Sequence, residues 1–243
     1  MSATGIGTPV ALVTGAASGL GAAVSDRLRA DGYEVVGADL DATAPWIECC
    51  DVRVDADVAR VVGVAQTRGP LRALVLSAAV ETRAPIIDCS DDDWRRVIDT
   101  NLKGAFVCMR HAVPAMVAAG GGSIVALGST LGSIVAPQYP AYCASKFGLT
   151  NLCKQVAIEH AADGVRVNVL SLGPTDTGLF VRLTDLAPDP EAVRAGVAAN
   201  LPMRRLGRAE EVCAAVSFLV SDAAAFTSGA VLPLDGGLAA RRM

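Results

Sequence analysis

Tyr142, Lys146 and Ser129 are the residues whose types and spacing could perform acid–base chemistry. Tyr142 and Lys146 are four positions apart, so on a helix their side chains would share one face. A phenol with its ordinary pKa of about 10 is a poor acid or base at neutral pH. An ammonium group about 4 Å away is worth roughly 4 kcal/mol at an effective dielectric of about 20, which would lower that pKa by about three units. The spacing therefore predicts a tyrosine that exchanges protons near neutral pH.

Ser129 would stand beside this pair. It follows the apolar run 123–127, which is typical of a buried strand, so its hydroxyl is expected at the mouth of a site. A lone Tyr-x-x-x-Lys pattern also arises by chance, and Ser129 could be an ordinary strand-end hydroxyl. The interpretation therefore depends on the rest of the chain.

A glycine-rich turn lies between a predicted strand, 10–14, and a predicted helix, 19–30. Gly15 would permit the tight turn, and Gly19 would let backbone N–H groups approach a pyrophosphate. Gly21 would let the helix pack closely on the sheet. The positive end of the helix dipole would face the phosphates, so this turn predicts a dinucleotide site.

Asp39 ends the next predicted strand, 34–39, and predicts which dinucleotide binds. A carboxylate here can accept hydrogen bonds from both ribose hydroxyls of NAD and repels a 2′-phosphate. The first basic residue after the turn is Arg27, which falls inside the predicted helix. NAD is therefore expected rather than NADP, although Asp39 could also be a solvated strand end.

Strand and helix patterns alternate along the whole chain. This predicts an α/β fold: a single doubly wound Rossmann-type domain over residues 1–243, with a seven-stranded parallel sheet and helices on both faces. Residues 1–9 are expected to be a tail, and residues 176–208 either a lid on the substrate side or an ordinary surface excursion. The strands are expected at 10–14, 34–39, 47–51, 73–77, 123–127, 165–170 and 230–234, and the helices at 19–30, 55–68, 90 to 116–119, 142–160 and 211–220.

Composition narrows the class of protein. Hydrophobic residues make up 52% and charged residues 19%, which is typical of a globular chain. A net charge of −4 argues against binding to nucleic acid or to an anionic membrane. The seven cysteines form no C-x-x-C pair and only two histidines occur, so we expect no metal site, reduced thiols and a cytoplasmic location. The start of the chain has no signal-peptide pattern, and the uncharged stretch 112–145 is interrupted by glycines and prolines, which argues against a membrane span.

With these residues assembled, the chain resembles the short-chain dehydrogenase/reductase family from about Val10 to Gly237. Thr14 to Gly21 is similar to the family's nucleotide loop, and Asp51-Val52 to its adenine contact. Leu234 to Gly237 is similar to its C-terminal signature. The catalytic tetrad of the family matches Asn101, Ser129, Tyr142 and Lys146, and its nicotinamide-carboxamide loop matches Asn168 and residues 173–177.

The resemblance implies which residues would bind the cofactor NAD. Two stretches depart from the family pattern: Leu76 to Ala79 replaces Asn-Asn-Ala-Gly, which should remove polar ties to the sheet, and Leu172-Gly173 replaces Pro-Gly. The implied cofactor-binding residues are Gly15, Ser18, Gly19, Leu20, Asp39, Asp51, Val52, Ser77, Ala78, Ala79, Tyr142, Lys146, Gly173, Thr175 and Thr177.

The resemblance also implies a reaction, the reversible hydride transfer between nicotinamide C4 and a secondary alcohol carbon. Tyr142 would move the proton and Lys146 would lower the tyrosine pKa and hold the nicotinamide ribose. Ser129 would bind the substrate oxygen, and Asn101 would hold a water that links Lys146 to solvent, unless it is a structural amide inside its helix.

The substrate is expected to be a small molecule, either an apolar or cyclic alcohol or a β-hydroxyacyl compound, because few charges fall in the expected pocket. Two alternatives remain open, a non-catalytic NAD(H)-binding sensor or scaffold, and the same fold acting as an enoyl reductase or epimerase. The helices 93–116 and 142–160 could pair between subunits of a homotetramer, as is common in the family. The expected pocket residues are Val80, Thr130, Leu131, Gln138, Tyr139, Leu179, Phe180 and Val181.

Overall fold

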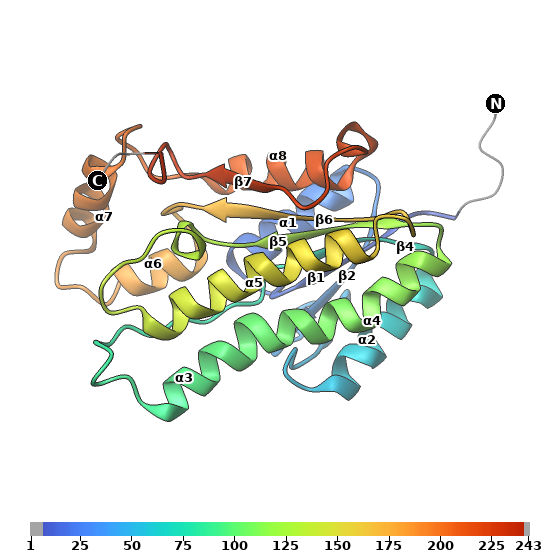
Figure 1. The fold of residues 1–243 in the computed structure, drawn as a ribbon, viewed down its shortest axis with the longest axis horizontal. Helices are drawn as coiled ribbons and strands as arrows, with labels where there is room; N and C mark the ends of the chain where they lie inside the picture. The colour runs from blue at the N-terminus through green and yellow to red at the C-terminus, as the bar shows by residue number, and fades with distance from the viewer. Residues whose placement is uncertain (1–6, 241–243) are drawn as a thin grey trace.

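The computed structural model describes residues 7–240, within which seven strands form one parallel sheet (Figure 1). The predicted seven-stranded parallel sheet is therefore confirmed. The strands are β1 (Val10–Thr14), β2 (Glu34–Asp39), β3 (Ile47–Cys49), β4 (Leu71–Leu76), β5 (Gly122–Leu127), β6 (Val165–Leu172) and β7 (Val231–Leu234). They lie in the order β3-β2-β1-β4-β5-β6-β7, and every neighbouring pair is parallel.

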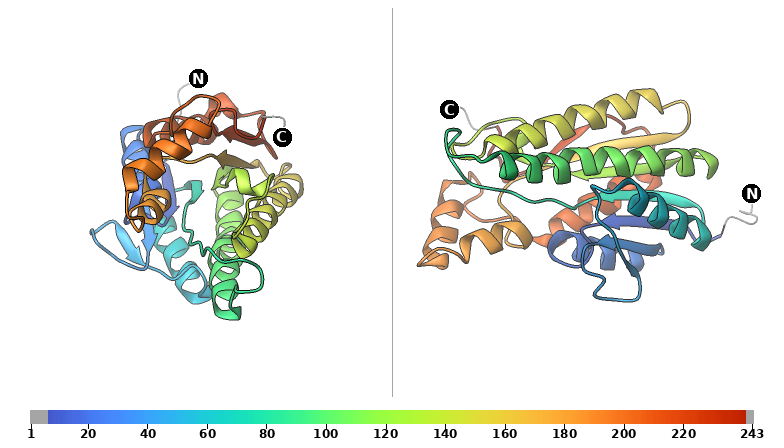
Figure 2. Two further views of the ribbon diagram at one scale, coloured as in Figure 1. Left: turned by 90° about the vertical axis from the view of Figure 1, so that its left-hand side faces the viewer. Right: turned by 90° about the horizontal axis from the view of Figure 1, so that it is seen from below.

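Helices cover both faces of the sheet, as predicted (Figures 1 and 2). On one face, α1 (Gly19–Ala30) packs beside α8 (Ala209–Val220). The other face carries α2 (Asp55–Arg68), α4 (Gly104–Ala118) and α5 (Pro140–Glu159). Each face has its own hydrophobic core, so the sheet is the shared middle layer.

Strand β1 shows why the sheet is buried on both faces. All five of its residues are buried, as expected of a parallel strand with helices above and below it. Val10 and Leu12 point into the core beneath α2 and α4, whereas Ala11 and Val13 point into the core beneath α1 and α8. The two-residue period of a strand thus supplies apolar side chains to both layers.

The order of the strands reverses beside β1, and this reversal creates a crevice at the carboxyl ends of β1 and β4. Thr14 ends β1, and its Oγ1 accepts hydrogen bonds from the N–H groups of Ser77 (3.0 Å) and Ala78 (3.1 Å). The backbone of the altered stretch Leu76 to Ala79 is therefore bonded to the sheet through Thr14, and the loss of polar side-chain interactions there stays a prediction.

Several predicted boundaries differ from the structure by one or two residues, and two predicted elements differ for a visible reason. Strand β3 ends at Cys49 instead of Asp51, because the Asp51 N–H donates to the Asp57 carboxylate (3.0 Å) and the Asp51 carboxylate accepts the Arg53 N–H (2.9 Å), which turns the chain. The helix expected from residue 90 to 116–119 is α3 (Asp91–Ile98) followed by a π-helical turn, Asp99–Lys103, and then α4.

Residues 176–208 contain two helices that the sequence pattern did not predict. They are α6 (Gly178–Thr184) and α7 (Pro190–Asn200), and they lie beyond the carboxyl ends of the strands (Figure 2). Helix α7 begins at Pro190, where the Asp189 side chain accepts the Ala192 N–H (2.9 Å), and it has no buried residue.

Of the expected N-terminal tail, residues 1–6 lie outside the described residues. Within residues 7–240, none of the helices combines the length and the hydropathy that crossing a bilayer would require.

Candidate active site

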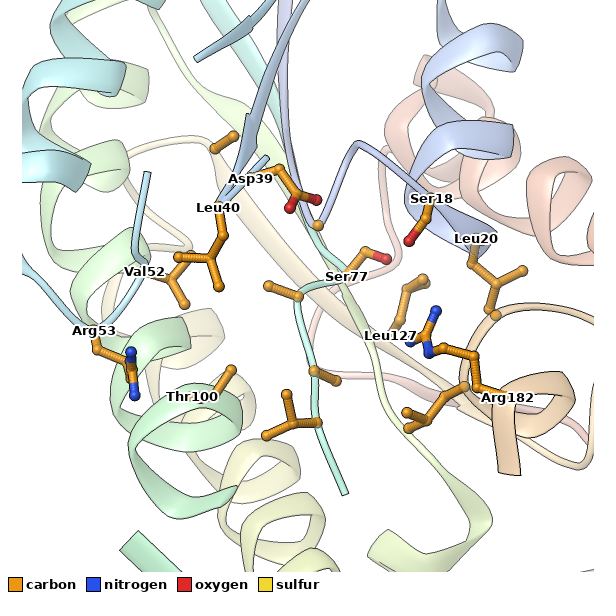
Figure 3. A pocket seen from close by; sticks show the side chains of 18 of the residues that line it. Ser18, Leu20, Asp39, Leu40, Val52, Arg53, Ser77, Thr100, Leu127 and Arg182 are labelled. Carbon is orange, nitrogen blue, oxygen red and sulfur yellow. The ribbon is translucent and has the colours of Figure 1, made fainter. Parts of the chain in front are cut away.

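A cavity of about 490 Å³ opens at the carboxyl ends of the central strands (Figure 3). Figure 3 shows Ser18 and Leu20 at the start of α1 on one side and Asp39 and Leu40 at the end of β2 on another. The cavity brings together, from the predicted cofactor set, Gly15, Ser18, Gly19, Leu20, Asp39, Asp51, Val52, Ser77, Ala78, Ala79, Tyr142 and Lys146.

The glycine-rich turn leaves its backbone open to this cavity. Gly15 (φ 67°) and Gly19 (φ 54°) have positive φ angles that favour glycine. A Cβ atom on Gly19 would lie 2.8 Å from the Cα atom of Gly178, so the turn and the start of α6 are in close contact. Ser18 caps α1 without a side-chain hydrogen bond, and the first turn of α1 has no acidic residue. The N–H groups of Gly15 and Ala17 are bonded to the Ala38 carbonyl and the Asp39 carboxylate, so the N–H groups at the start of α1 are those that could bind an anion.

Asp39 joins the end of β2 to the glycine-rich turn. Its Oδ2 accepts the Ala17 N–H at 2.9 Å, and its Oδ1 has only a long contact of 3.3 Å from the Asp41 N–H. One carboxylate oxygen thus has capacity for a further donor. On the neighbouring wall, Asp51 forms an ion pair with Arg53 (2.7 Å), and the hydrogen bonds from Arg53 lower the pKa of Asp51.

Helix α5 and the end of β5 position the acid–base residues. Pro140 starts α5 and places Tyr142 in its first turn, where the tyrosine is buried. The Lys146 Nζ donates to the Leu127 carbonyl at 2.9 Å and lies 5.5 Å from the centre of the Tyr142 ring. The Ser129 hydroxyl accepts the Leu131 N–H (3.1 Å), and Ser129 acts on Tyr142 to lower the pKa of the tyrosine. Tyr142, Ser129 and Lys146 therefore form one cluster.

Electrostatics at this cluster differ from the expectation. Burial raises the pKa of Tyr142 above its ordinary value and the negative charge of Glu81 raises it further, whereas the hydrogen bond from Ser129 lowers it. Burial also lowers the pKa of Lys146 to about 8. The predicted low tyrosine pKa is wrong for the protein chain alone, because the loss of hydration of a buried phenolate outweighs an ammonium group that is directed at the Leu127 carbonyl.

Asn101 lies in the π-helical turn and does not line the main cavity. Its Oδ1 accepts the Val80 N–H at 2.8 Å, and its Nδ2 donates to the Val80 carbonyl (2.8 Å) and to the Ser145 hydroxyl (3.1 Å). In this arrangement the amide fixes the segment after β4 against α5.

The expected substrate residues divide into two groups. Val80, Leu131, Tyr139 and Leu179 pack with Tyr142 in one apolar cluster, in which the two tyrosine rings meet edge to face with centres 6.3 Å apart. The others lie outside the main cavity and outside that cluster. They are Thr130, which is buried, Gln138, which accepts a hydrogen bond from Arg83 (2.7 Å), and the half-buried Phe180 and Val181.

The expected carboxamide loop stands apart from the main cavity. Gly173 packs against Asp235, where a Cβ atom would lie 2.7 Å from the Asp235 Cα. Thr175 lines a second cavity of about 320 Å³, and Thr177 precedes α6 without a capping hydrogen bond. Asn168 is buried in β6, where it donates to the Thr227 carbonyl (2.8 Å) and accepts the Ala230 N–H (3.0 Å), so it ties β6 to the start of β7.

Eleven cavity residues were missed by the sequence reasoning. Arg182 lies on α6 and extends its guanidinium group toward the space between Leu20 and Leu127 (Figure 3). It was missed because α6 itself was not predicted. The other ten carried no spacing signal of their own; they are Ala38, Leu40, Cys50, Arg53, Arg96, Thr100, Leu127, Gly128, Leu172 and Gly178.

Known proteins are similar to this chain over nearly its whole length. The sequence model of a protein family described as enoyl-(acyl carrier protein) reductase matches residues 15–239. A cis-4-hydroxycyclohexanecarboxylate dehydrogenase of Sinomonas cyclohexanicum is 40% identical over 95% of this chain and 96% of that protein. A D-threitol dehydrogenase of Mycolicibacterium smegmatis is 39% identical over 94% of this chain and 92% of that protein.

Solved structures share the fold over nearly the whole chain. An aldohexose dehydrogenase of Thermoplasma acidophilum superposes with a TM-score of 0.92 at 31% identity and covers 98% of both chains. A levodione reductase superposes with a TM-score of 0.92 at 26% identity and covers 98% of this chain and 100% of that chain.

Proposed function

Since the chain belongs to the short-chain dehydrogenase/reductase family, we propose that it is an NAD-dependent oxidoreductase that interconverts a secondary alcohol and a ketone. One observation carries the proposal: Tyr142 opens onto the same cavity as the glycine-rich turn and Asp39. A proton-transfer group thus stands where a dinucleotide would place its reactive ring.

The walls of the cavity fit a nicotinamide dinucleotide. The uncapped start of α1 and the positive φ angles of Gly15 and Gly19 suit a pyrophosphate. The Oδ1 atom of Asp39 has capacity for a ribose hydroxyl. Arg53 is the nearby cation that could bind a 2′-phosphate, but its ion pair with Asp51 neutralises it. These contacts support NAD over NADP.

The residues of the chain divide the chemistry between them. When bound, the nicotinamide supplies the hydride acceptor or donor at its C4 atom. Tyr142 passes the proton to or from the substrate oxygen, and Ser129 donates a hydrogen bond to that oxygen as charge develops on it. Lys146, held by the Leu127 carbonyl, provides the positive charge that stabilises the phenolate and holds the nicotinamide ribose.

Asn101 acts through other groups in this proposal. It fixes Val80 and Ser145, which border the acid–base cluster, and it could hold the water that connects Lys146 to solvent. Its three hydrogen bonds give it a positioning role in addition to the expected catalytic one.

The apolar cluster around Tyr142 supports an apolar or cyclic alcohol, or a β-hydroxyacyl compound, as the substrate. Val80, Leu131, Tyr139 and Leu179 form its wall. We take residues 176–208, with α6 and α7, as a lid over this end of the cavity. A cyclic hydroxy acid and a polyol are the substrates named for the two curated relatives, and both substrates carry a secondary alcohol.

The description of the matching family model favours a second candidate, the reduction of an enoyl thioester. The pairing of Ser129 with Tyr142 favours carbonyl chemistry instead, because both hydroxyl groups could donate to one substrate oxygen.

A coupled assay tests the proposal. The assay measures the absorbance of NADH at about 340 nm. We expect the protein to reduce NAD with members of a panel of secondary alcohols, polyols, steroids and β-hydroxyacyl thioesters, and to be less active with NADP. Reduction of an enoyl thioester alone would favour the second candidate. Tight NADH binding without turnover of any substrate would identify a sensor or scaffold.

A further inference from the structure

Arg182 is a cation of the main cavity that the proposed mechanism does not use. It lies on α6, and Figure 3 shows its guanidinium group extending toward the space between Leu20 and Leu127. Among residues 7–240, no hydrogen bond and no ion pair joins this group to another residue. A guanidinium group binds phosphates and carboxylates through paired hydrogen bonds, so Arg182 is available to an anionic ligand.

The other three cations that line this cavity already have partners. Arg53 and Arg96 each form an ion pair with an aspartate, at 2.7 Å and 3.4 Å. The Nζ atom of Lys146 donates to a main-chain carbonyl at 2.9 Å. Of the cavity cations in the described part of the chain, Arg182 is therefore the one whose side chain has no bonded partner.

Glu81 is an acid on which Arg182 acts, but it does not pair with it. Burial raises the pKa of Glu81 to about 7, and the positive charges of Lys146, Arg182 and Arg83 oppose that rise. Glu81 is not among the residues that line the main cavity, and within residues 7–240 no ion pair joins it to Arg182. The guanidinium group therefore keeps its capacity for an anion inside the cavity.

Helix α6 carries Arg182 to the part of the cavity where the proposed function puts the pyrophosphate. Its first residue, Gly178, lies against the glycine-rich turn, where a Cβ atom on Gly19 would be 2.8 Å from the Gly178 Cα. Arg182 follows Gly178 by four positions, so the two residues share one face of α6. The guanidinium group is directed toward Leu20 in the first turn of α1, which has no acidic residue to pair with it. Two phosphates with two negative charges suit this position better than a single carboxylate does.

We propose that Arg182 binds the pyrophosphate of the dinucleotide and thereby stabilises the position of α6 over the bound cofactor. The inference rests on the dinucleotide site of the proposed function and adds a residue to it. Leu179, on the same helix, lines the cavity and packs in the apolar cluster with Tyr142. The contact with the phosphates therefore also stabilises one wall of the substrate site.

The test measures binding and needs no substrate. The dissociation constant of NADH is measured by fluorescence, and those of ADP-ribose and adenosine by competition with NADH. Arg182→Met should raise the dissociation constants of NADH and ADP-ribose about tenfold or more, because a charge-assisted contact with the phosphates is lost, and should not change that of adenosine. Arg182→Lys keeps the charge but not the planar group, so it should raise the first two constants only about threefold.

Two controls separate a lost contact from a disturbed fold. Arg95→Met removes a cation from an exposed position on α3, outside the main cavity, and should leave all three dissociation constants unchanged. Hydrogen exchange of the backbone of residues 178–184 should slow when NADH binds to the wild-type protein. In Arg182→Met saturated with NADH, the exchange of the same residues should slow much less.

The outcomes separate the inference from the proposed function. An unchanged affinity for NADH in Arg182→Met would overturn the inference, and the guanidinium group would then serve an anionic substrate. An equal loss of affinity for adenosine would also overturn it, because the effect would not depend on the phosphates. Failure of the wild-type protein to bind NADH and ADP-ribose would overturn the proposed function and this inference with it. Binding of NADH that depends on Arg182, without turnover of any alcohol, would support the inference and overturn the proposed activity.

Discussion

The buried surroundings of Lys146 disfavour the charged form of its side chain. The side chain is 3% exposed, and burial lowers its pKa from 10.5 to about 8. Between these two values the unfolded chain binds more protons than the folded protein. The free energy of unfolding therefore rises with pH across this window. The cost of burying the charged ammonium group is fully present below about pH 8.

Replacement of Lys146 by methionine should remove this dependence. The free energy of unfolding of Lys146→Met minus that of wild type should be about 3 kcal/mol larger at pH 7 than at pH 10.5. Urea unfolding at both pH values, without cofactor, measures the difference. Lys154→Met, at an exposed position on the same helix, is the control and should show almost no change. An equal difference at both pH values would contradict a buried ammonium at position 146.

Asp39 should decide the choice of cofactor. In Asp39→Asn one oxygen remains for the Ala17 N–H, but the negative charge is lost. We expect the KM for NAD to rise and the ratio of kcat/KM for NADP to that for NAD to increase about tenfold or more, because the repulsion of a 2′-phosphate is worth more than about 1 kcal/mol at short range. Initial rates with NAD and with NADP measure this ratio.

The neighbouring Asp41 provides the control for this prediction. Asp41 is exposed and does not line the cavity, so Asp41→Asn should leave the cofactor ratio unchanged. An unchanged ratio in Asp39→Asn would show that the carboxylate does not face the ribose.

At the scale of elements, Asn101 connects the π-helical turn to two other parts of the chain. Asn101→Asp loses the Nδ2 donor, which leaves the Val80 carbonyl and the Ser145 hydroxyl without that partner. The free energy of unfolding should fall by about 2 kcal/mol or more, since unpaired buried polar groups cost about 1–3 kcal/mol each. Asn151→Asp loses an exposed donor to the Phe147 carbonyl and should cost less than about 0.5 kcal/mol. Similar losses in the two variants would contradict the positioning role.

The elements that were predicted correctly are those with a strong local pattern. Strand β1, helix α1 and strand β2 have the expected bounds, because an apolar run, a glycine-rich turn and a strand-end aspartate each act locally. The same local signals brought twelve of the expected cofactor residues into one cavity.

The features that were missed depend on tertiary contacts. The π-helical turn forms where Asn101 binds the distant Val80, and no sequence period indicates it. Helix α6 packs on the glycine-rich turn through Gly178. The position of Arg182 in the cavity depends on this contact and could not be predicted from the sequence. The spacing of Tyr142 and Lys146 predicts proximity but not burial, and burial determines the sign of the pKa shift.

At the scale of the whole molecule, the outer surfaces of α4 and α5 carry exposed apolar side chains. Phe106 is 44% exposed and Ile158 is 81% exposed. Such residues suit a subunit interface, and from them and the family resemblance we expect a homotetramer. Light scattering should give four times the mass of the chain, and the double substitution Phe106→Asp with Ile158→Asp should lower that mass.

The control for the interface lies in a loop. Ile87 is 88% exposed between β4 and α3, and Ile87→Asp should leave the assembly intact. A monomeric wild-type protein, or a mass that the double substitution does not change, would contradict an interface through α4 and α5.

The most direct measurement compares Tyr142→Phe with wild type in NAD reduction and in NADH binding. The substitution removes one hydroxyl group and leaves the ring in its apolar cluster. We expect kcat to fall by about 10²–10⁴-fold, the usual contribution of a positioned acid–base group, and NADH to bind with unchanged affinity. Full turnover by Tyr142→Phe would contradict the account, because the proton would then leave the substrate by another route.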